Sequence, residues 1–155
     1  MDDLVRWLGE QLDEDERIAK VATPGPWRQH DTHLGQYGHT ATVLSGERNE
    51  TDLRAWLPSM SQESWDEARN VWADAVHIAA WDPARVLREI DAKREQIAWC
   101  VEVIGDRDLS RYGELGALKD DPDALAVTLA VETLRLIAAP FSVRPGYRAE
   151  WVPSE

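Results

Sequence analysis

Three histidines and an aspartate stand close together in the first third of the chain: His30, Asp31, His33 and His39. Imidazole and carboxylate groups are common zinc ligands, and a zinc site needs about three or four of them at roughly 2 Å from the metal. On a strand, Asp31 and His33 would share one face, and His39 would return on a partner strand. The spacing is not one of the usual zinc-ligand patterns. The sequence therefore favours a polar hairpin surface, with a metal site as the alternative.

A second group of chemically capable side chains surrounds the Asp82–Pro83 step. His77 lies about one turn before this step. As a general base it would need a nucleophile or an orienting carboxylate nearby, and the sequence identifies neither. The chain also lacks a P-loop and the GxGxxG, GxSxG and HExxH motifs. We therefore predict no catalytic residue and no cofactor, and the balance is against an enzyme. The candidate residues for binding a ligand or a partner are Trp72, His77, Trp81, Arg85 and Arg94.

Eight tryptophans and one cysteine are the other notable side chains. Trp65 and Trp72 are seven residues apart on an expected helix, so both should face the same partner. Core packing is the simpler interpretation of the tryptophans, and an exposed aromatic groove for a peptide or planar ligand is the alternative. Cys100 lies in an apolar helical segment, which predicts a buried, unreactive thiol.

Length and charge narrow the functional classes. A chain of 155 residues predicts one domain, residues 1–155. The net charge of −12 argues against direct binding to nucleic acid, which requires a basic surface. A solvated acidic surface is the simple interpretation, and a DNA-mimicking inhibitor is the alternative. The single Cys100 excludes an intramolecular disulfide and fits a reducing cytoplasm best. Neither a signal peptide nor a membrane-spanning segment is expected.

Hydrophobic periodicity predicts four helices. The first covers residues 3–21. The second ends near Ala80, and either Ser59 with Gln62 or Ser64 with Glu67 could form its capping box. Asp82 suits the N-cap and Pro83 the first turn of a third helix that runs to Ile104, followed by Gly105.

Asp121–Pro122 repeats that signal and predicts a fourth helix that extends to Ala139. This helix is so apolar that it should be the most buried one. After its first turn, three of its few polar residues line one narrow stripe: Thr128, Glu132 and Arg135.

Strand-forming sequence is confined to residues 27–58, where Trp27–His33 and His39–Leu44 predict a small β-hairpin. Residues 141–155 should form an extended C-terminal tail that packs on the helices through Tyr147 or Trp151. The expected fold is mainly α (α+β): an irregular bundle of about four helices with a small inserted β-hairpin.

Three motifs resemble a known family: TPGPWR at 23–28, HIAAWDPARVLREIDAKR at 77–94, and RPGYRAEW at 144–151. Together they resemble an uncharacterised family of small actinobacterial and actinophage proteins, known only as a domain of unknown function. The resemblance runs nearly end to end and is least close over 29–76. Members usually carry a histidine where this chain has Trp81. The resemblance implies source and architecture and supplies no activity.

Two functional hypotheses follow. The first is a non-enzymatic interaction or regulatory protein, possibly phage-derived, that acts through a protein partner or as a homo-oligomer and not at a membrane. This hypothesis rests on Arg94, which interrupts the apolar a/d pattern of the third helix and could pair with an acidic partner. The alternative is a small-molecule or nucleotide-binding protein, possibly an enzyme, with a tryptophan-lined pocket near the 77–94 helix joint.

Overall fold

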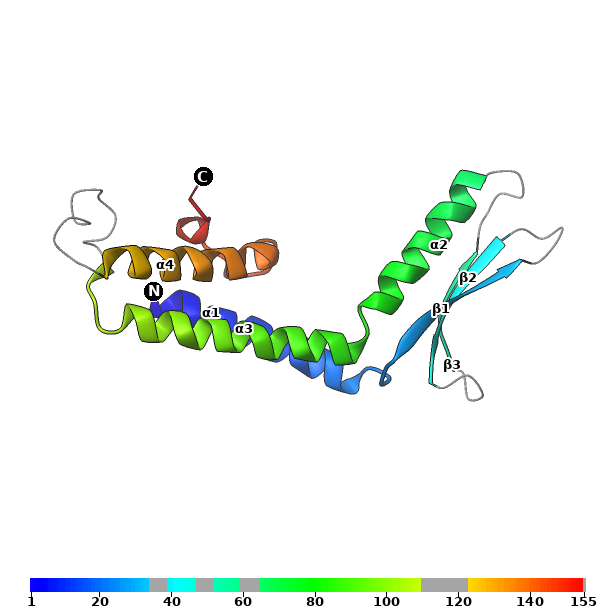
Figure 1. The fold of residues 1–155 in the computed structure, drawn as a ribbon, viewed down its shortest axis with the longest axis horizontal. Coiled ribbons are helices and arrows are strands. Elements are labelled where there is room, and N and C mark those ends of the chain that lie inside the picture. Colours follow the sequence, from blue (N-terminus) through cyan, green and yellow to red (C-terminus); the bar gives the residue numbers. More distant parts are fainter. Residues whose placement is uncertain (34–38, 47–51, 59–64, 110–122, 155) are drawn as a thin grey trace. The chain divides into compact units, whose positions relative to one another are not determined.

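Four helices and one antiparallel sheet make up the fold (Figure 1). The computed structural model describes all residues except 34–38, 47–51, 59–64, 110–122 and 155. The predicted mainly α fold with a small β insertion is confirmed. The insertion has one strand more than the predicted hairpin. The elements are α1 (Asp2–Val21), β1 (Trp27–His33), β2 (His39–Ser45), β3 (Asp52–Pro58), α2 (Trp65–Ala80), α3 (Pro83–Ile104), α4 (Ala124–Ala138) and the short 3-10 helices η4 (Ala139–Phe141) and η5 (Ala149–Trp151).

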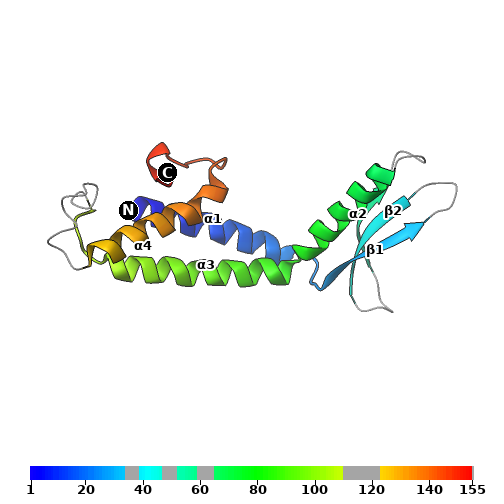
Figure 2. The same ribbon diagram turned by 45° about the horizontal axis from the view of Figure 1, so that its top comes forward.

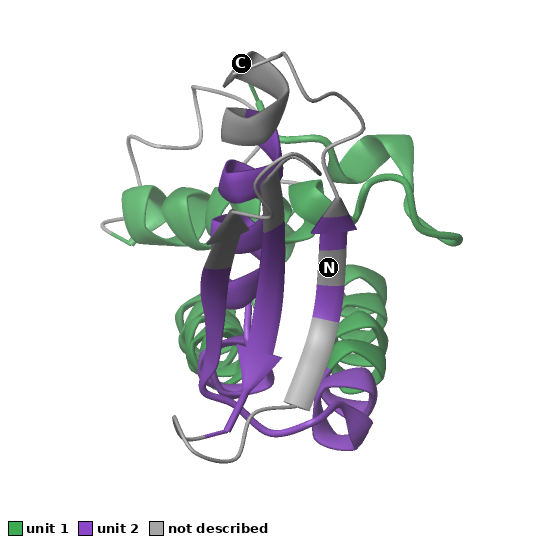
Figure 3. Cartoon of the chain, turned by 90° about the vertical axis from the view of Figure 1, so that its right-hand side faces the viewer, with its two compact units in different colours: residues 1–15, 89–155 green, residues 16–88 purple. Residues whose placement is uncertain are grey.

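The chain divides into two compact units, which Figure 3 shows in different colours. Unit 1 contains residues 1–15 and 89–155, and unit 2 contains residues 16–88. The boundaries fall inside α1 and inside α3, so each of these helices contributes to both units.

Unit 1 is a helical bundle in which α4 runs beside the first part of α1 and the last part of α3 (Figures 1 and 2). The predicted apolar face of α1 is buried: Leu4, Leu8 and Leu12 are fully inaccessible to solvent. Removing such side chains from water is the main stabilising contribution to a core. From α3 and α4, the buried residues of this unit include Ile90, Ile97, Cys100, Ile104, Val127, Ala130 and Leu134.

The C-terminal tail packs on α1 through aromatic rings. The Trp7 ring lies 5.6 Å from the Tyr147 ring and 5.2 Å from the Trp151 ring, centroid to centroid. Two arginines of the tail also pair with acidic residues of α1, Arg144 with Asp15 at 2.6 Å and Arg148 with Asp3 at 3.0 Å. The RPGYRAEW motif therefore attaches the tail to α1 by both apolar and ionic contacts.

Unit 2 contains the sheet, in the order β1-β2-β3, with α2 packed on one face. Ala41 and Val43 of the central strand are buried against Ala75 and Ala79 of α2. Small alanine side chains allow a helix to approach a sheet closely. The remaining members of this core are Trp27, Ala55, Leu57, Val71 and Ile78.

Core packing, the simpler interpretation of the tryptophans, was wrong for Trp72. Its side chain is 46% exposed, and Val71 and Ile78 contact the sheet instead. Adjacent residues of a helix are separated by about 100°, and Ala75 and Ala79 remain buried, so the buried face is turned away from Trp72 by less than one residue. The side chain of Trp65 and the capping residues Ser59, Gln62 and Ser64 lie outside the described residues.

The predicted ends of α3 are confirmed. The backbone N–H of Arg85 donates to Asp82 Oδ1 at 2.7 Å, which is the hydrogen bond of an N-cap. At the other end Gly105 has φ +54 and its N–H donates to Val101 O at 2.9 Å. Glycine adopts this left-handed conformation without a steric penalty, and so it stops the helix there.

The start of α4 differs from the prediction, because the described helix begins at Ala124 with Asp123 at the N-cap. Asp121 and Pro122 lie outside the described residues. Among the described residues, one helical segment, Ala124–Phe141, is long and apolar enough to cross a membrane. The core helix of a soluble protein passes the same test of length and composition.

Candidate functional site

Three of the predicted site residues come together at the joint between α2 and α3. The rings of His77 and Trp81 are 6.2 Å apart, and the Arg85 guanidinium lies 4.3 Å from the centre of the Trp81 ring. Arg85 Nη1 also donates to the carbonyl of Ala80 at 3.1 Å. The cation–π contact and this hydrogen bond give Arg85 a structural role in closing the end of α2.

The same joint contacts the first family motif. A Cβ atom at Gly25 would lie 2.5 Å from Asp82 Oδ2 and 2.9 Å from Asp82 Cγ. Only a residue without a side chain fits at this distance. The TPGPWR and DPAR segments therefore pack directly against each other, and both help to build the corner of unit 2.

The two other predicted site residues do not join this group. Trp72 lies more than a turn before His77 on α2 and is exposed. Arg94 belongs to unit 1, where its Nη2 donates to Asp13 Oδ1 of α1 at 2.6 Å. Arg94 thus has the acidic partner on a neighbouring helix that its position predicted, and that partner belongs to the same chain.

Three of the four candidate metal ligands are placed only by their backbone. The register sets His33 directly opposite His39 and Asp31 opposite Ala41, so these positions share one face of the sheet, as predicted. His30 pairs with Thr42 on the other face, and its carbonyl accepts a hydrogen bond from Thr42 Oγ1. The side chains of Asp31, His33 and His39 lie outside the described residues. Within the described residues, no three His, Cys, Asp or Glu side chains form a metal-binding group.

The tryptophans have no single role. Trp7 and Trp151 are buried in unit 1, whereas Trp72, Trp81 and Trp99 are between 43% and 53% exposed. Cys100 is fully buried, as predicted, and burial raises the pKa of its thiol. A thiol in this environment is a poor nucleophile.

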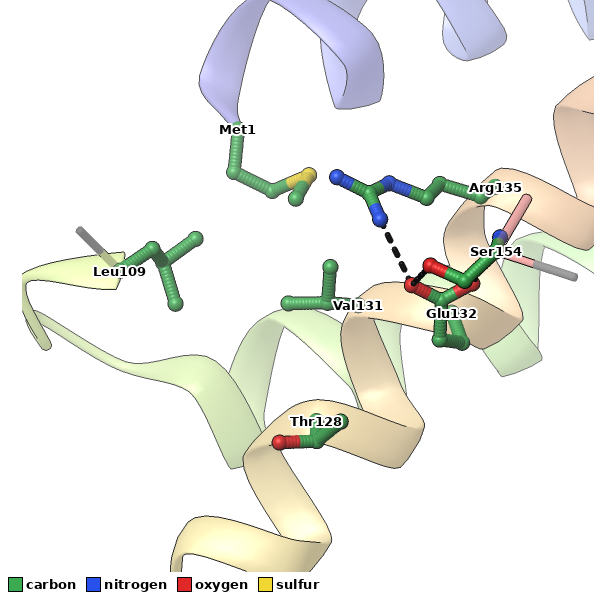
Figure 4. Close-up of a pocket in the computed structure, with 7 residues that line it drawn as sticks. All are labelled: Met1, Leu109, Thr128, Val131, Glu132, Arg135 and Ser154. Atoms are coloured by element: carbon green, nitrogen blue, oxygen red, sulfur yellow. Dashed lines mark hydrogen bonds and ion pairs between the residues drawn. The ribbon is translucent and has the colours of Figure 1, made fainter. Parts of the chain in front are cut away.

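The polar stripe of α4 lines a cavity of about 260 Å³ in unit 1 (Figure 4). Arg135 Nη1 donates to Glu132 Oε1 at 2.6 Å. Ser154 of the tail donates to the same carboxylate through its N–H at 3.0 Å and its hydroxyl at 3.1 Å. The stripe could be seen in the sequence, but the partners of Glu132 could not. The cavity is lined by Met1, Leu109, Thr128, Val131, Glu132, Arg135 and Ser154.

These contacts stabilise the charged form of Glu132. Burial by itself raises the pKa of this carboxyl, but the hydrogen bonds from Ser154 and Arg135 and the charge of Arg135 outweigh it and hold the pKa below the ordinary value of 4.5. A group with a lowered pKa in the folded state stabilises the protein above its unfolded pKa. That stabilisation is lost as the pH falls through the folded pKa.

We expect Glu132→Gln to lower the free energy of unfolding at neutral pH, and the difference from the unmodified protein to shrink toward about pH 3. Urea unfolding at both pH values measures it. Glu95→Gln, which removes an exposed carboxylate on α3, is the charge control and should change stability by less than about 0.5 kcal/mol at each pH. An equal deficit for Glu132→Gln at both pH values would contradict the assigned contacts.

Comparison with known proteins gives a family and no activity. No curated protein and no solved structure matches the chain. One family model, described as "Family of unknown function (DUF6221)", matches residues 1–153. The match covers all three motifs, the α2–α3 joint and every residue that lines the cavity of α4 except Ser154. The chain therefore belongs to this family of unknown function.

Proposed function

We propose that this protein is a non-enzymatic interaction protein that binds a basic amphipathic helix through one face of α4. The observation that carries the proposal is the exposure of three leucines on that face. Leu125, Leu129 and Leu136 are 68%, 55% and 60% exposed. Their spacing of four and seven residues places them along one side of the helix, opposite the buried side.

The length of this face suits a helix as the partner. Eleven residues separate Leu125 from Leu136, which corresponds to about 16 Å along the axis at 1.5 Å per residue. A partner helix with apolar residues at positions i, i+4 and i+11 would match the three leucines over the same distance. Apolar ridges of this kind supply the affinity in helix-in-groove recognition.

The charge of unit 1 favours a basic partner. Residues 1–15 and 89–155 hold 19 acidic and nine basic residues, whereas residues 16–88 hold ten and eight. The excess negative charge therefore belongs mainly to the unit that carries the exposed leucines. It attracts a partner with lysine or arginine beside its apolar ridge and repels a second copy of this chain.

Designed peptides test this proposal. We expect a helical peptide with a leucine ridge and lysine flanks to bind in fluorescence anisotropy, and the same ridge with glutamate flanks to bind far less. Leu129→Gln with Leu136→Gln should weaken binding at least tenfold, because burial of each leucine contributes about 1.5–3 kcal/mol and 1.4 kcal/mol is tenfold. Val101→Gln, which replaces an exposed apolar residue on α3, is the matched control and should leave binding unchanged.

Several outcomes would overturn the proposal. One is binding of a lysine peptide whose ridge is serine, because charge alone would then explain it. A second is a homodimer in light scattering that the two leucine substitutions dissociate. A third is adsorption of the protein to uncharged phospholipid vesicles that the same substitutions abolish. A phage-derived, host-modulating role is a finer form of the proposal, and its support is the sequence resemblance alone.

A further inference from the structure

The cavity of α4 combines apolar walls with a cation. Met1, Leu109 and Val131 supply apolar atoms from the residue before α1, from the turn after α3 and from α4 itself. Arg135 enters from the α4 side, as Figure 4 shows. The volume of about 260 Å³ is just below the usual range for ligand sites, so the cavity suits a molecule of only a few carbon atoms.

Arg135 retains hydrogen-bonding capacity after its pairing with Glu132. A guanidinium has five N–H donors, and Glu132 Oε1 accepts from Nη1. In Figure 4 the other terminal nitrogen points away from Glu132 and toward the Met1 side chain. Arg135 Nε is buried and has no hydrogen-bond partner among the described residues. A buried donor without an acceptor is unfavourable, and so this edge of the guanidinium is suited to an added acceptor.

The charges at the site decide which acceptor fits. Glu132 already provides one negative charge beside Arg135, and Ser154 holds that carboxylate in place. A monocarboxylate adds one more negative charge and matches the planar guanidinium fork. A phosphate dianion would add two negative charges and raise the total beside this one cation to three, and an alkylammonium ion would be repelled by Arg135.

We propose that the Arg135 cavity binds a small monocarboxylate, with the carboxylate on the free guanidinium edge and a short alkyl chain against Met1, Leu109 and Val131. The site uses a different side of α4 from the three exposed leucines. Because the two sites use different sides of the helix, carboxylate binding and peptide binding can be gained or lost independently. Ser154 connects the carboxylate site to the C-terminal tail through Glu132.

Titration with acetate, butanoate, butylammonium and butyl phosphate tests the proposal, followed through the Arg135 Nε–H signal in ¹H–¹⁵N spectra. We expect saturable shifts with butanoate and affinity about tenfold lower for acetate, because each buried methylene contributes about 0.8 kcal/mol. Arg135→Gln should lose at least tenfold in affinity for butanoate, followed there by ligand-observed NMR. Val101→Gln, on α3 and outside the cavity lining, should lose none.

A second, cavity-filling variant tests the same proposal if Arg135→Gln fails to fold. Val131→Phe keeps the guanidinium but occupies the space for the alkyl chain, so butanoate affinity should fall toward that of acetate. Undiminished butanoate binding by Val131→Phe would overturn the proposal. Equal binding of butylammonium, or no saturation with butanoate up to tens of millimolar, would overturn it as well.

Discussion

Trp7→Ala should lower the free energy of unfolding by about 3–5 kcal/mol, the range for large aromatic residues removed from a core. Trp7 is 7% exposed and its ring meets those of Tyr147, Trp151 and Phe141 at centroid distances of 5.6, 5.2 and 6.5 Å. Its indole N–H donates to the carbonyl of Pro145 at 3.0 Å. The substitution removes this contact surface for the tail and leaves a cavity beside α1.

Chemical denaturation followed by far-ultraviolet circular dichroism measures this loss. Trp99→Ala is the matched control, because Trp99 also lies in unit 1 but is 53% exposed, and it should cost less than about 0.5 kcal/mol. Limited proteolysis should also cut the tail of Trp7→Ala faster than that of Trp99→Ala. Equal losses in the two variants would show that the tail does not depend on Trp7.

Gly25→Ala should lower the free energy of unfolding by about 1–3 kcal/mol, as overpacking of a tight contact does. The added Cβ would lie 2.5 Å from Asp82 Oδ2, and Asp82 cannot move away without weakening its cap on the N–H of Arg85. Asp82→Ala by itself should cost about 1 kcal/mol through loss of that cap.

The two substitutions should not be additive. In the Asp82→Ala background the carboxylate that meets the new methyl group is gone, so Gly25→Ala should cost much less there. A double-mutant cycle measures this coupling energy. Gly9→Ala is the control, because a Cβ at Gly9 meets nothing within 4 Å and alanine favours a helix; it should be neutral or stabilising. Additive costs would contradict the contact between the first family motif and the joint.

Local signals were sufficient for the helices. The Leu4, Leu8 and Leu12 spacing predicted the buried face of α1, and Asp82 and Gly105 predicted the ends of α3, because these signals act within one or two helical turns. The sheet was predicted less completely from the sequence. Its first two strands follow from β-forming residues near a glycine-containing loop, but β3 becomes a strand only by pairing with β2.

Side-chain environments were predicted less well than elements. Trp72 was expected in the core and is exposed, because the sheet contacts the neighbouring face of α2. On α4, the apolar composition predicted burial, yet Leu125, Leu129 and Leu136 remain exposed opposite the buried side. Composition reports how apolar a helix is, whereas the number of neighbours that cover it depends on the whole chain.

The sequence by itself determined the four helices, both ends of α3, the excess of acid and the three motifs of the family, because each depends on residues that are close in the chain. Only the tertiary structure decided that Gly25 meets Asp82, that Trp7 holds the tail, and that Ser154 and Arg135 converge on Glu132. These contacts join residues far apart in sequence, and their distances depend on the packing of several elements at once. The candidate site of α4 belongs to this second group, since one polar stripe becomes a cavity only when Met1, the turn after α3 and the tail surround it.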